Sequence, residues 1–494
     1  MGRGDLLATM AVMRRACLCA LLVVGATAGL ARANGRFPAT TNVQFQPGND
    51  QFMLIPATYG LQISSDGGQT IKWVCEAAVG YTGTYDPDYE ITSDGVIYAT
   101  TFEGLRRSTD HGCSWVTLED PDVDGTTFIN SVEIGPDGRI WAATSQGGQP
   151  NDIFVSEDGV EFESTGLLTD SWWLSVETTP ADVNRVYASG YYPGVSDNPN
   201  TPEDEGIPPR ALLRRRTTPD GPWEELLVDD FNFVPETEEC QGDPTLPQCR
   251  VNPFIYLLGV SPTDPDLLFA RAVAVNPPSG DDLYRSTNGG ESWEKVLDLG
   301  DSISGFVIRQ DGTVVVGSAR PCLGEPPAAE KGCVRTSSQN GAAESWQTPA
   351  TEIRMQCLGE RSDGVLFACV PHAQPDLRVL VKSTDGESWE TVMRFSDLAE
   401  PGAGPLECAD DTVQATTCVP QAWPQLACID LLLDLPMCAG SDAGASAGDA
   451  GVDESPGEGG CCRVGSRPGL AALPTVLALL WLVRPRRRRS RRAA

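Results

Sequence analysis

Aspartates at alternate positions form the candidate ion site of this sequence. Asp120, Asp122 and Asp124 stand in the segment DPDVDG. Alternate carboxylates can converge on one Ca²⁺, and the glycine that follows allows a sharp turn. The twelfth position of such a loop is Ser131, where an EF-hand has Glu. We therefore interpret the segment as an Asp-rich turn and keep calcium as the alternative, and no motif requires another cofactor.

Hydrolytic chemistry cannot be assigned to particular residues from the sequence. Glycoside hydrolysis needs two carboxylates at a suitable separation, and 68 Asp and Glu residues offer too many pairs to choose from. A sialidase would also need three arginines that converge on the carboxylate of its substrate, and no spacing identifies them. We predict no catalytic residue and keep a glycoside hydrolase as the alternative.

The cysteines favour an oxidising compartment and a set of disulfides. Setting aside Cys17, Cys19, Cys461 and Cys462, twelve of the sixteen cysteines remain. Close spacing predicts three local bridges, and Cys75 would then pair with Cys113 by default. The local pairs are Cys240 with Cys249, Cys322 with Cys333, and Cys357 with Cys369. Four more cysteines recur every ten residues and predict a two-disulfide cap or stalk whose three connectivities stay open: Cys408, Cys418, Cys428 and Cys438.

A short turn motif recurs along the body of the chain. STDHGCSW at residues 108–115 returns as STNGGESW at 286–293 and STDGESW at 383–389, with looser copies elsewhere. An acid or amide in the turn can accept backbone N–H bonds, and the glycine beside it tolerates positive φ. The turn residues are Asp66, Asp110, Asp158, Asn288 and Asp385. We predict that they are structural rather than catalytic.

Each copy of the motif is expected to close on an aromatic side chain that packs between sheets. The seven closing residues are Trp73, Trp115, Phe162, Trp223, Trp293, Trp346 and Trp389. Short β-like runs precede the turns and supply about four strands for each unit. Seven small sheets packed around one axis bury both faces of every sheet. The sequence therefore predicts an all-β, seven-bladed β-propeller over residues 34–395.

The repeat resembles the Asp-box, or BNR, repeat of sialidase-like and sortilin-like propellers. This resemblance implies the fold and not an activity. With each box between the third and fourth strands, the long insertions at 193–209, 229–252 and 320–332 should open on the opposite face of the ring. Loops on such rigid scaffolds commonly carry function.

The two ends of the chain predict export and attachment to a surface. Arg14 and Arg15 precede an apolar run and the small-residue site Ala31-Arg32-Ala33, which predicts a signal peptide over 1–33. A Cys-rich cap or stalk at 396–440 and a Gly/Ala/Asp/Ser linker at 441–460 follow the propeller.

The last segment, residues 461–494, combines three features of a sorting signal. Cys461 and Cys462 precede a short apolar run and an Arg cluster, which predict one short transmembrane helix with the propeller outside. The pattern resembles the MYXO-CTERM sorting domain, which implies processing near the Cys pair and display on a Gram-negative bacterial surface.

Charge restricts the partners. Without the four Arg and one Asp of residues 1–33 and the nine Arg of 461–494, the body holds 23 basic and 67 acidic residues. Nucleic acid is excluded because its phosphates need a basic surface. We predict a non-enzymatic binding or adhesion scaffold for a surface protein or polysaccharide, with a membrane contact through the C-terminal segment. The alternatives are a carbohydrate-active hydrolase, sialidase-like or glucanase-like, and an assembly factor.

Overall fold

The computed structural model describes residues 37–439, apart from 84, 120–124, 126, 195–208, 219, 232–253, 274–279, 323–330, 351–352 and 374–376. The description concerns the compact unit that begins at Pro38. The predicted signal peptide, the linker and the sorting signal with Cys461 and Cys462 lie outside the described residues.

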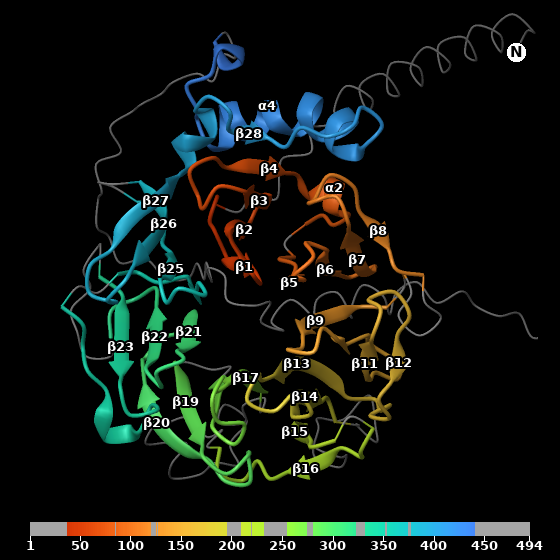
Figure 1. Cartoon of the computed structure of the whole chain (residues 1–494), viewed down its shortest axis with the longest axis vertical. Coiled ribbons are helices and arrows are strands. Elements are labelled where there is room, and N and C mark those ends of the chain that lie inside the picture. The colour runs from red at the N-terminus through yellow and green to blue at the C-terminus, as the bar shows by residue number, and fades with distance from the viewer. Residues whose placement is uncertain are drawn as a thin grey trace, which may run out of the picture. The chain divides into compact units, whose positions relative to one another are not determined.

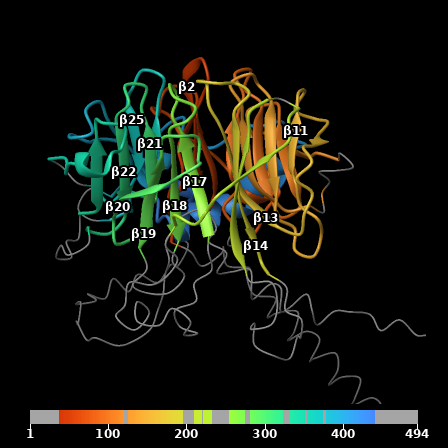
Figure 2. The ribbon, with the colours of Figure 1, turned by 90° about the horizontal axis from the view of Figure 1, so that it is seen from below.

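Seven antiparallel sheets stand around a common axis, as predicted (Figure 1). Each sheet is a meander whose first strand lies nearest the axis, and Figure 2 shows the strands running roughly parallel to that axis. Blades 1 to 4 consist of β1 (Gln44–Gln46), β2 (Asn49–Ala57), β3 (Gly60–Ser64), β4 (Lys72–Val74); β5 (Tyr89–Ile91), β6 (Ile97–Thr101), β7 (Gly104–Ser108), β8 (Val116–Thr117); β9 (Ile129–Ile134), β10 (Ile140–Thr144), β11 (Ile153–Ser156), β12 (Glu163–Ser164); and β13 (Trp172–Thr178), β14 (Val186–Tyr192), β15 (Arg210–Arg216), β16 (Glu224–Leu226).

Blade 6 has three strands, and its fourth is reduced to an isolated bridge between Thr336 and Gln347. Blades 5 to 7 consist of β17 (Phe254–Val260), β18 (Leu268–Val273), β19 (Asp281–Ser286), β20 (Glu294–Asp298); β21 (Gly305–Ile308), β22 (Val314–Ser318), β23 (Cys333–Ser337); and β24 (Cys357–Glu360), β25 (Leu366–Cys369), β26 (Arg378–Ser383), β27 (Glu390–Arg394).

The second strand is the most buried in blades 2, 3 and 6, because neighbouring sheets cover both of its faces. In β6, β10 and β22 every residue is buried, and their sequences IYATT, IWAAT and VVVGS combine β-branched, aromatic and small side chains. The hydrophobic core consequently lies between blades. For example, Phe269 of blade 5 packs with Val314 and Val316 of blade 6.

The C-terminal segment, residues 400–439, folds back onto blade 1, and we call it the C-terminal clasp. Its strand β28 (Gly404–Pro405) pairs in parallel with β4 at the outer edge of blade 1 (Figure 1). The buried Gln414 side chain donates to Trp73 O (2.8 Å) and accepts from Cys75 N (3.2 Å). Trp423 packs against Trp73, with ring centroids 5.4 Å apart. Blade 1 is therefore covered by the end of the chain.

The default pairing of Cys75 with Cys113 is wrong, and so is the two-disulfide cap predicted from the four regularly spaced cysteines, of which only Cys428 and Cys438 bond each other. Cys75 bonds Cys418 and Cys113 bonds Cys408, so two of the four regularly spaced cysteines staple the clasp to blades 1 and 2. Spacing could not reveal this, because the partners lie 343 and 295 residues apart. The local pairs Cys322–Cys333 and Cys357–Cys369 are confirmed, Cys428 bonds Cys438, and Cys240 and Cys249 lie outside the described residues.

The clasp is largely helical between Gln414 and Asp430. A continuous helical run comprises η4 (Gln414–Ala422), α4 (Trp423–Gln425) and η5 (Leu426–Asp430). The other short helices are α2 (Glu76–Val79), η2 (Ala343–Ser345), η3 (Phe395–Ala399) and η6 (Pro436–Cys438). Within the described part of the chain, no helix has the length and apolar character needed to cross a membrane.

We predict that the two clasp disulfides stabilise the ring cooperatively. Removing either Cys75–Cys418 or Cys113–Cys408 by Ser substitution should lower the free energy of unfolding by about 2–5 kcal/mol. Removing both bridges should cost more than the sum of the single losses. When one bridge is removed, the other still holds the clasp near the ring, so the chain segment that is freed stays short. Urea unfolding of the four proteins measures this difference.

The Cys428–Cys438 pair is the control, since it closes only ten residues within the clasp. Its loss should cost less than that of either long-range bridge. If the losses of unfolding free energy for the two long-range bridges are strictly additive, the two bridges do not stabilise the clasp cooperatively.

Candidate functional site

The predicted turn residues lie between the third and fourth strands of their blades, and each is used inside its own turn. Asp66 Oδ1 accepts from the backbone N–H groups of Gln69 (3.0 Å) and Thr70 (2.8 Å). Asp158 Oδ1 accepts in the same way from Val160 (2.8 Å) and Glu161 (2.9 Å). The other members of the set repeat the pattern: Asp110 with Ser114, Asn288 with Ser292, and Asp385 with Glu387 and Ser388.

A serine two residues before the acid is a second part of the turn, and sequence reasoning gave it no role. Ser156 Oγ donates to Asp158 Oδ1 (3.1 Å) and accepts from Gly159 N (2.8 Å). Gly159 has φ 72°, in the left-handed region that favours glycine. The same relay occurs at Ser64, Ser108, Ser286 and Ser383. Its signal was present, because every quoted motif begins with this serine.

The turns lower the pKa of their carboxyl groups from the ordinary value of 3.8. For Asp158 and Asp385 the main cause is hydrogen bonding from backbone N–H groups to the ionised form. For Asp66 and Asp110 burial raises the pKa, but the summed hydrogen bonds outweigh it.

The closing residue of blade 1 is Ile71, and the assignment of Trp73 is wrong. Trp115, Phe162, Trp293 and Trp389 each stand directly before a fourth strand, and the residue in that place in blade 1 is Ile71, which is 2% exposed. Trp73 lies two residues later, inside β4, and donates its indole N–H to Tyr59 O (2.9 Å). Trp73 packs against the clasp. The sequence assignment chose it because it is the aromatic residue nearest to the expected closing position.

Blades 4 and 6 keep the closing aromatic but have altered turns. Trp223 directly precedes β16 and donates to Thr165 Oγ1 of blade 3 (3.0 Å). In blade 6, Ser337 Oγ still accepts from Gly341 N (3.1 Å) before Trp346. The closing position thus survives where the acid of the turn is absent.

The long insertions fall on the connections predicted for them. Two join second to third strands, between Tyr192 and Arg210 in blade 4 and between Ser318 and Cys333 in blade 6. The third joins β16 to β17. The strand ends that border these connections lie at the face opposite the turns.

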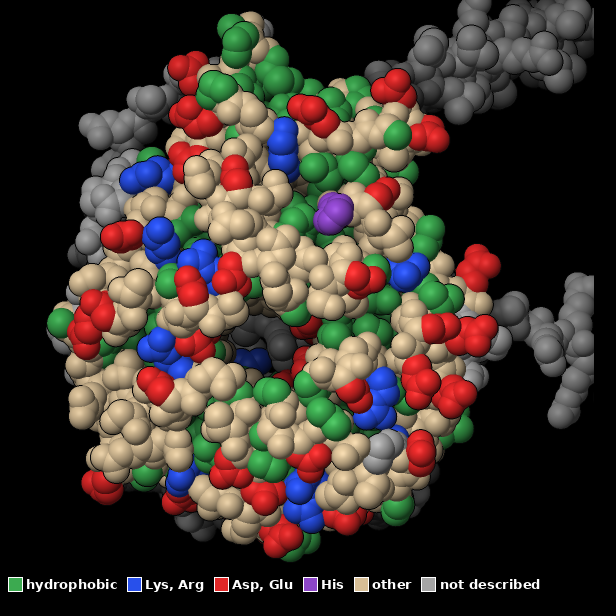
Figure 3. Space-filling view, in the orientation of Figure 1, with side chains coloured by type: hydrophobic (Ala, Val, Ile, Leu, Met, Phe, Trp, Pro, Cys, Tyr) green, Lys and Arg blue, Asp and Glu red, His purple; other side chains and the backbone are tan. Residues whose placement is uncertain are grey.

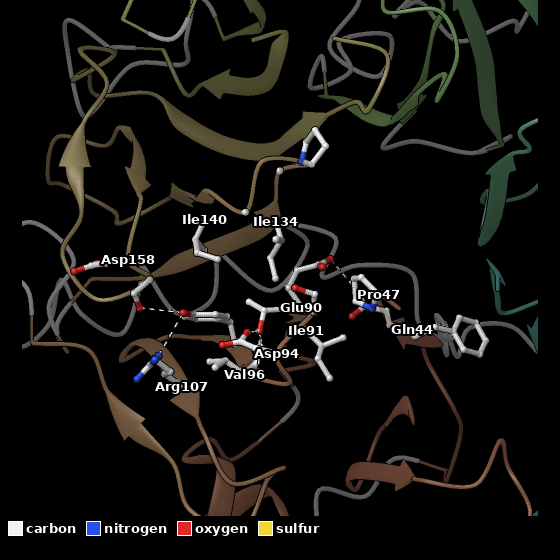
Figure 4. A pocket seen from close by; sticks show the side chains of 18 of the residues that line it. Gln44, Pro47, Glu90, Ile91, Asp94, Val96, Arg107, Ile134, Ile140 and Asp158 are labelled. Atoms are coloured by element: carbon white, nitrogen blue, oxygen red, sulfur yellow. Dashed lines mark hydrogen bonds between the residues drawn. The ribbon is translucent and has the colours of Figure 1, made fainter. Parts of the chain in front are cut away.

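The turn face carries a hollow of about 640 Å³ between blades 7, 1, 2 and 3, which we call the turn-face hollow (Figure 4). Its polar groups largely bind one another. Gln44 donates to Glu90 (3.1 Å), and Arg107 donates to the hydroxyl of Tyr98 (3.3 Å), which donates to Gly159 O (3.0 Å). Burial raises the pKa of Tyr98, and Arg107 partly opposes that rise. We interpret this hollow as a seam between blades.

The central channel is lined by all seven blades near the opposite face, with a cavity of about 180 Å³. The space-filling view is hollowed at the centre of the ring (Figure 3). The lining residues lie mostly at the starts of the first strands, where the sheets converge. Its polar residues are Thr41, Asn42, Asp86, Asp88, Asn130, Ser131, Tyr256, Arg271, Ser304 and Gln356. We take this channel as the candidate functional site.

Arg271 is the one basic residue among the described residues of the channel lining. Its guanidinium donates to Asp281 Oδ2 (3.0 Å) and to Ile303 O (3.0 Å) and lies over the ring of Tyr256. Both partners of the ion pair are buried, with side chains 6% and 3% exposed. Burial raises the pKa of Asp281, and Arg271 opposes that rise. The two charges of this ion pair therefore cancel each other within the wall of the channel.

Gln356 precedes β24 and is 6% exposed, yet its side-chain oxygen has no hydrogen-bond partner. Gln44 and Gln62 also have an unpartnered Oε1, but their Nε2 groups donate to Glu90 and to Tyr59. For Gln356, the buried atom without a partner among the described residues is Oε1. A buried polar group left unpaired is costly, so this oxygen is available to a hydrogen-bond donor in the channel.

The three aspartates of the alternative calcium loop lie outside the described residues, so this site stays a prediction. Ser131, its twelfth position, lies in β9 and donates to Asp88 Oδ2 (3.4 Å). Over the described part of the chain, no group of three or more His, Cys, Asp and Glu side chains could hold a metal ion.

No family model matches the chain, and no curated protein matches its sequence. A GH74 enzyme from Niastella koreensis is similar in structure, with 12% identity, 71% of this chain and 69% of that chain covered, and a TM-score of 0.30. YCF48 from Cyanidioschyzon merolae matches at 12% identity over 69% of this chain and 94% of its own, with a TM-score of 0.40. A puromycin-hydrolyzing peptidase of Mycobacterium tuberculosis matches at 13% identity over 74% and 53%, with a TM-score of 0.43. These likenesses assign no activity to this chain.

We predict that the turn carboxylates make the ring sensitive to acid. Their pKa values are lowered on folding, so the stability they contribute is present above the ordinary pKa and is lost as the pH falls through the lowered one. Asp158→Asn should keep the Oδ1 acceptor and reduce the loss of stability between pH 5 and 3. Asp158→Ala removes the acceptor and should lower Tm by roughly 1–2 °C at pH 7.

Asn288 is the natural precedent for the amide variant, since it accepts from Ser292 N (3.0 Å) in the same geometry. Thermal melts of both variants across this pH range provide the measurement. Equal acid sensitivity of the Asn variant and the unchanged protein would contradict the prediction.

Proposed function

We propose that this protein is an exported, surface-attached binding scaffold that captures its ligand non-covalently in the central channel. The observation that carries the proposal is the buried side-chain oxygen of Gln356, which has no hydrogen-bond partner and lies in a channel to which every blade contributes. Binding sites commonly keep polar groups that only the ligand satisfies, at some cost to stability.

Export is supported by the disulfides of the described residues. Five bridges are formed, two of which are needed to hold the end of the chain against the ring. Such bridges persist in oxidising compartments and are rare in the cytosol. The signal peptide and the sorting signal predicted from the sequence agree with this location.

The rigidity of the channel also supports a binding role. Its walls are the first strands of closely packed sheets, and Arg271 is fixed by Asp281 and by Ile303 O. A site on rigid elements loses little conformational entropy when a ligand binds.

A hydrolase is the second candidate, favoured by the two carboxylates Asp86 and Asp88 in the channel lining. Glycoside hydrolysis uses a pair of carboxylates on either side of the scissile bond. These two stand on one segment of blade 2, and Asp88 Oδ2 already accepts from Val132 N (3.4 Å). This placement favours recognition over bond cleavage.

We predict that Gln356→Leu separates stability from binding. The variant should be more stable by about 1 kcal/mol, because an unpaired buried carbonyl is removed. It should lose saturable binding to arrayed polysaccharides and to outer-membrane fractions of a Gram-negative bacterium. Thermal melts and binding isotherms of the full chain provide the two measurements.

Gln62→Leu is the matched control, since Gln62 is also buried but lies in β3, away from the channel lining. It should retain binding. The proposed binding function would be overturned if Gln356→Leu retained binding. It would also be overturned if the unchanged protein released reducing ends from the polysaccharides.

A further inference from the structure

The two disulfides that hold the clasp to the ring differ in their exposure. Cys75 and Cys418 are buried, at 3% and 0% exposed, whereas Cys113 and Cys408 are both half-buried. In each of the other three bridges among the described residues, at least one cysteine is buried. Cys113–Cys408 is therefore the described bridge that a thiol in solution reaches most easily, and exposed disulfides exchange more readily than buried ones.

The exposed bridge lies in a segment that is fixed at both ends, residues 400–412, which we call the strap. Before the strap, Leu398 of η3 is 1% exposed and belongs to the core of blade 1 and blade 7. After the strap, Cys418 in the helical run is bonded to Cys75. Opening the exposed bridge alone therefore leaves both ends of the strap in place.

The remaining hold of the strap on blade 1 is short. Strand β28 pairs with only two residues of β4, and Leu406 N donates to Trp73 O (2.9 Å) just after it. Glu407 pairs with Lys72 (3.5 Å), but its side chain is 92% exposed, so this ion pair contributes little. A segment with few buried contacts opens locally at much less cost than global unfolding. Without its bridge, the strap is expected to leave the edge of blade 1 while the ring stays folded.

The surroundings of the exposed bridge carry negative charge. Three exposed acids flank Cys408 in the strap, Glu407, Asp410 and Asp411. Asp110 is exposed in the turn that carries Cys113, and Lys72 offsets only the charge of Glu407. The whole clasp holds six acidic residues and no Lys or Arg. Such a field repels anions and favours reagents that are neutral or cationic.

We propose that Cys113–Cys408 is a thiol-exchange site, at which a small neutral or cationic thiol compound opens the bridge and frees the strap. The thiolate of the compound attacks one sulfur, forms a mixed disulfide with it and releases the other cysteine as a thiolate. A second molecule of the thiol attacks the mixed disulfide. One bridge is thereby reduced to two cysteine thiols, which take up the two protons, and two small thiols are oxidised to their disulfide. This site goes beyond the proposed binding function and does not depend on the ligand of the channel.

Stepwise reduction of the full chain tests the order in which the bridges open. Cysteamine is added at increasing concentration, free thiols are blocked with iodoacetamide, and the labelled cysteines are identified by mass spectrometry. Cys113 and Cys408 should be labelled at least about tenfold faster than Cys75 and Cys418. Opening of another described bridge first, or of all bridges in one step, would refute the site.

Three small thiols test the charge preference of the site. Cysteamine is cationic, 2-mercaptoethanol is neutral and 3-mercaptopropionate is anionic. Each rate is divided by the rate of the same thiol with bis(2-hydroxyethyl) disulfide, which removes differences in reactivity between the thiols. At about 0.01 M salt the corrected rate should be at least about fivefold higher for cysteamine than for 3-mercaptopropionate, and this ratio should approach one at about 1 M salt. Equal corrected rates at low salt would overturn the proposal.

Charge variants locate this preference to the strap. Asp410→Asn combined with Asp411→Asn should lower the ratio of corrected rates at least about twofold. Glu161→Gln combined with Glu163→Gln is the matched control, because it removes the same charge from exposed positions of blade 3, and it should leave the ratio unchanged. Equal effects of the two double variants would contradict a local field at the bridge.

Hydrogen exchange tests whether the strap leaves blade 1. After the exposed bridge is opened, peptides from residues 400–412 should exchange at least about tenfold faster, whereas peptides from 414–430 should not change, because Cys75–Cys418 still holds them. Cys113→Ser combined with Cys408→Ser should show this pattern without any thiol. If that variant does not fold, the thiol-treated protein supplies the comparison. Unchanged exchange of the strap in the opened protein would overturn its release.

Discussion

A ring of sheets has to be closed where its first blade meets its last, and here the strand that crosses that boundary, β28, joins only the outer edge of blade 1. Blade 1 is built from β1–β4 and blade 7 from β24–β27, each from one continuous stretch of chain. The contact between them relies on close approach: Thr40 Oγ1 donates to Val379 O (2.8 Å), and a Cβ on Gly359 would lie 2.8 Å from Val43 O. The clasp then carries the chain past blade 7 to the outer edge of blade 1, where β28 and two disulfides hold it. The channel keeps its shape only while this closure holds.

The features that repeat within short segments could be predicted from the sequence. The turn acids, the glycines beside them and the apolar strands recur locally, and together they indicated seven sheets around an axis. The error at Trp73 arose inside this pattern, because blade 1 fills the closing position with Ile71, an aliphatic side chain that no search for aromatics would select. Long-range features could not be predicted in this way. The pairing of Cys75 with Cys418 depends on where the end of the chain packs, and no local spacing contains that information.

The residues of the candidate site could be predicted from the sequence even less than the long-range disulfides. Gln356, Arg271 and Asp86 come from three different blades and meet only because the ring brings the starts of their sheets together. None of them stands in a motif, and glutamine is common in loops and strand ends. What distinguishes Gln356 is a property of the folded molecule, a buried side-chain oxygen without a hydrogen-bond partner. The acids of the body could be counted from the sequence, but their position in the channel could not.

The clasp also sets the order in which the molecule can be completed. Cys75 lies in the first blade, and its partner Cys418 follows the last. In a chain that crosses a membrane from its N-terminus, Cys75 and Cys113 therefore emerge before Cys418 and Cys408, their final partners. Oxidation before these partners emerge would join Cys75 to Cys113 and shut the end of the chain out of its place on the ring. Correct assembly thus depends on the thiols of the first two blades remaining reduced, or on their bridges being exchanged, until the clasp at residues 400–439 arrives.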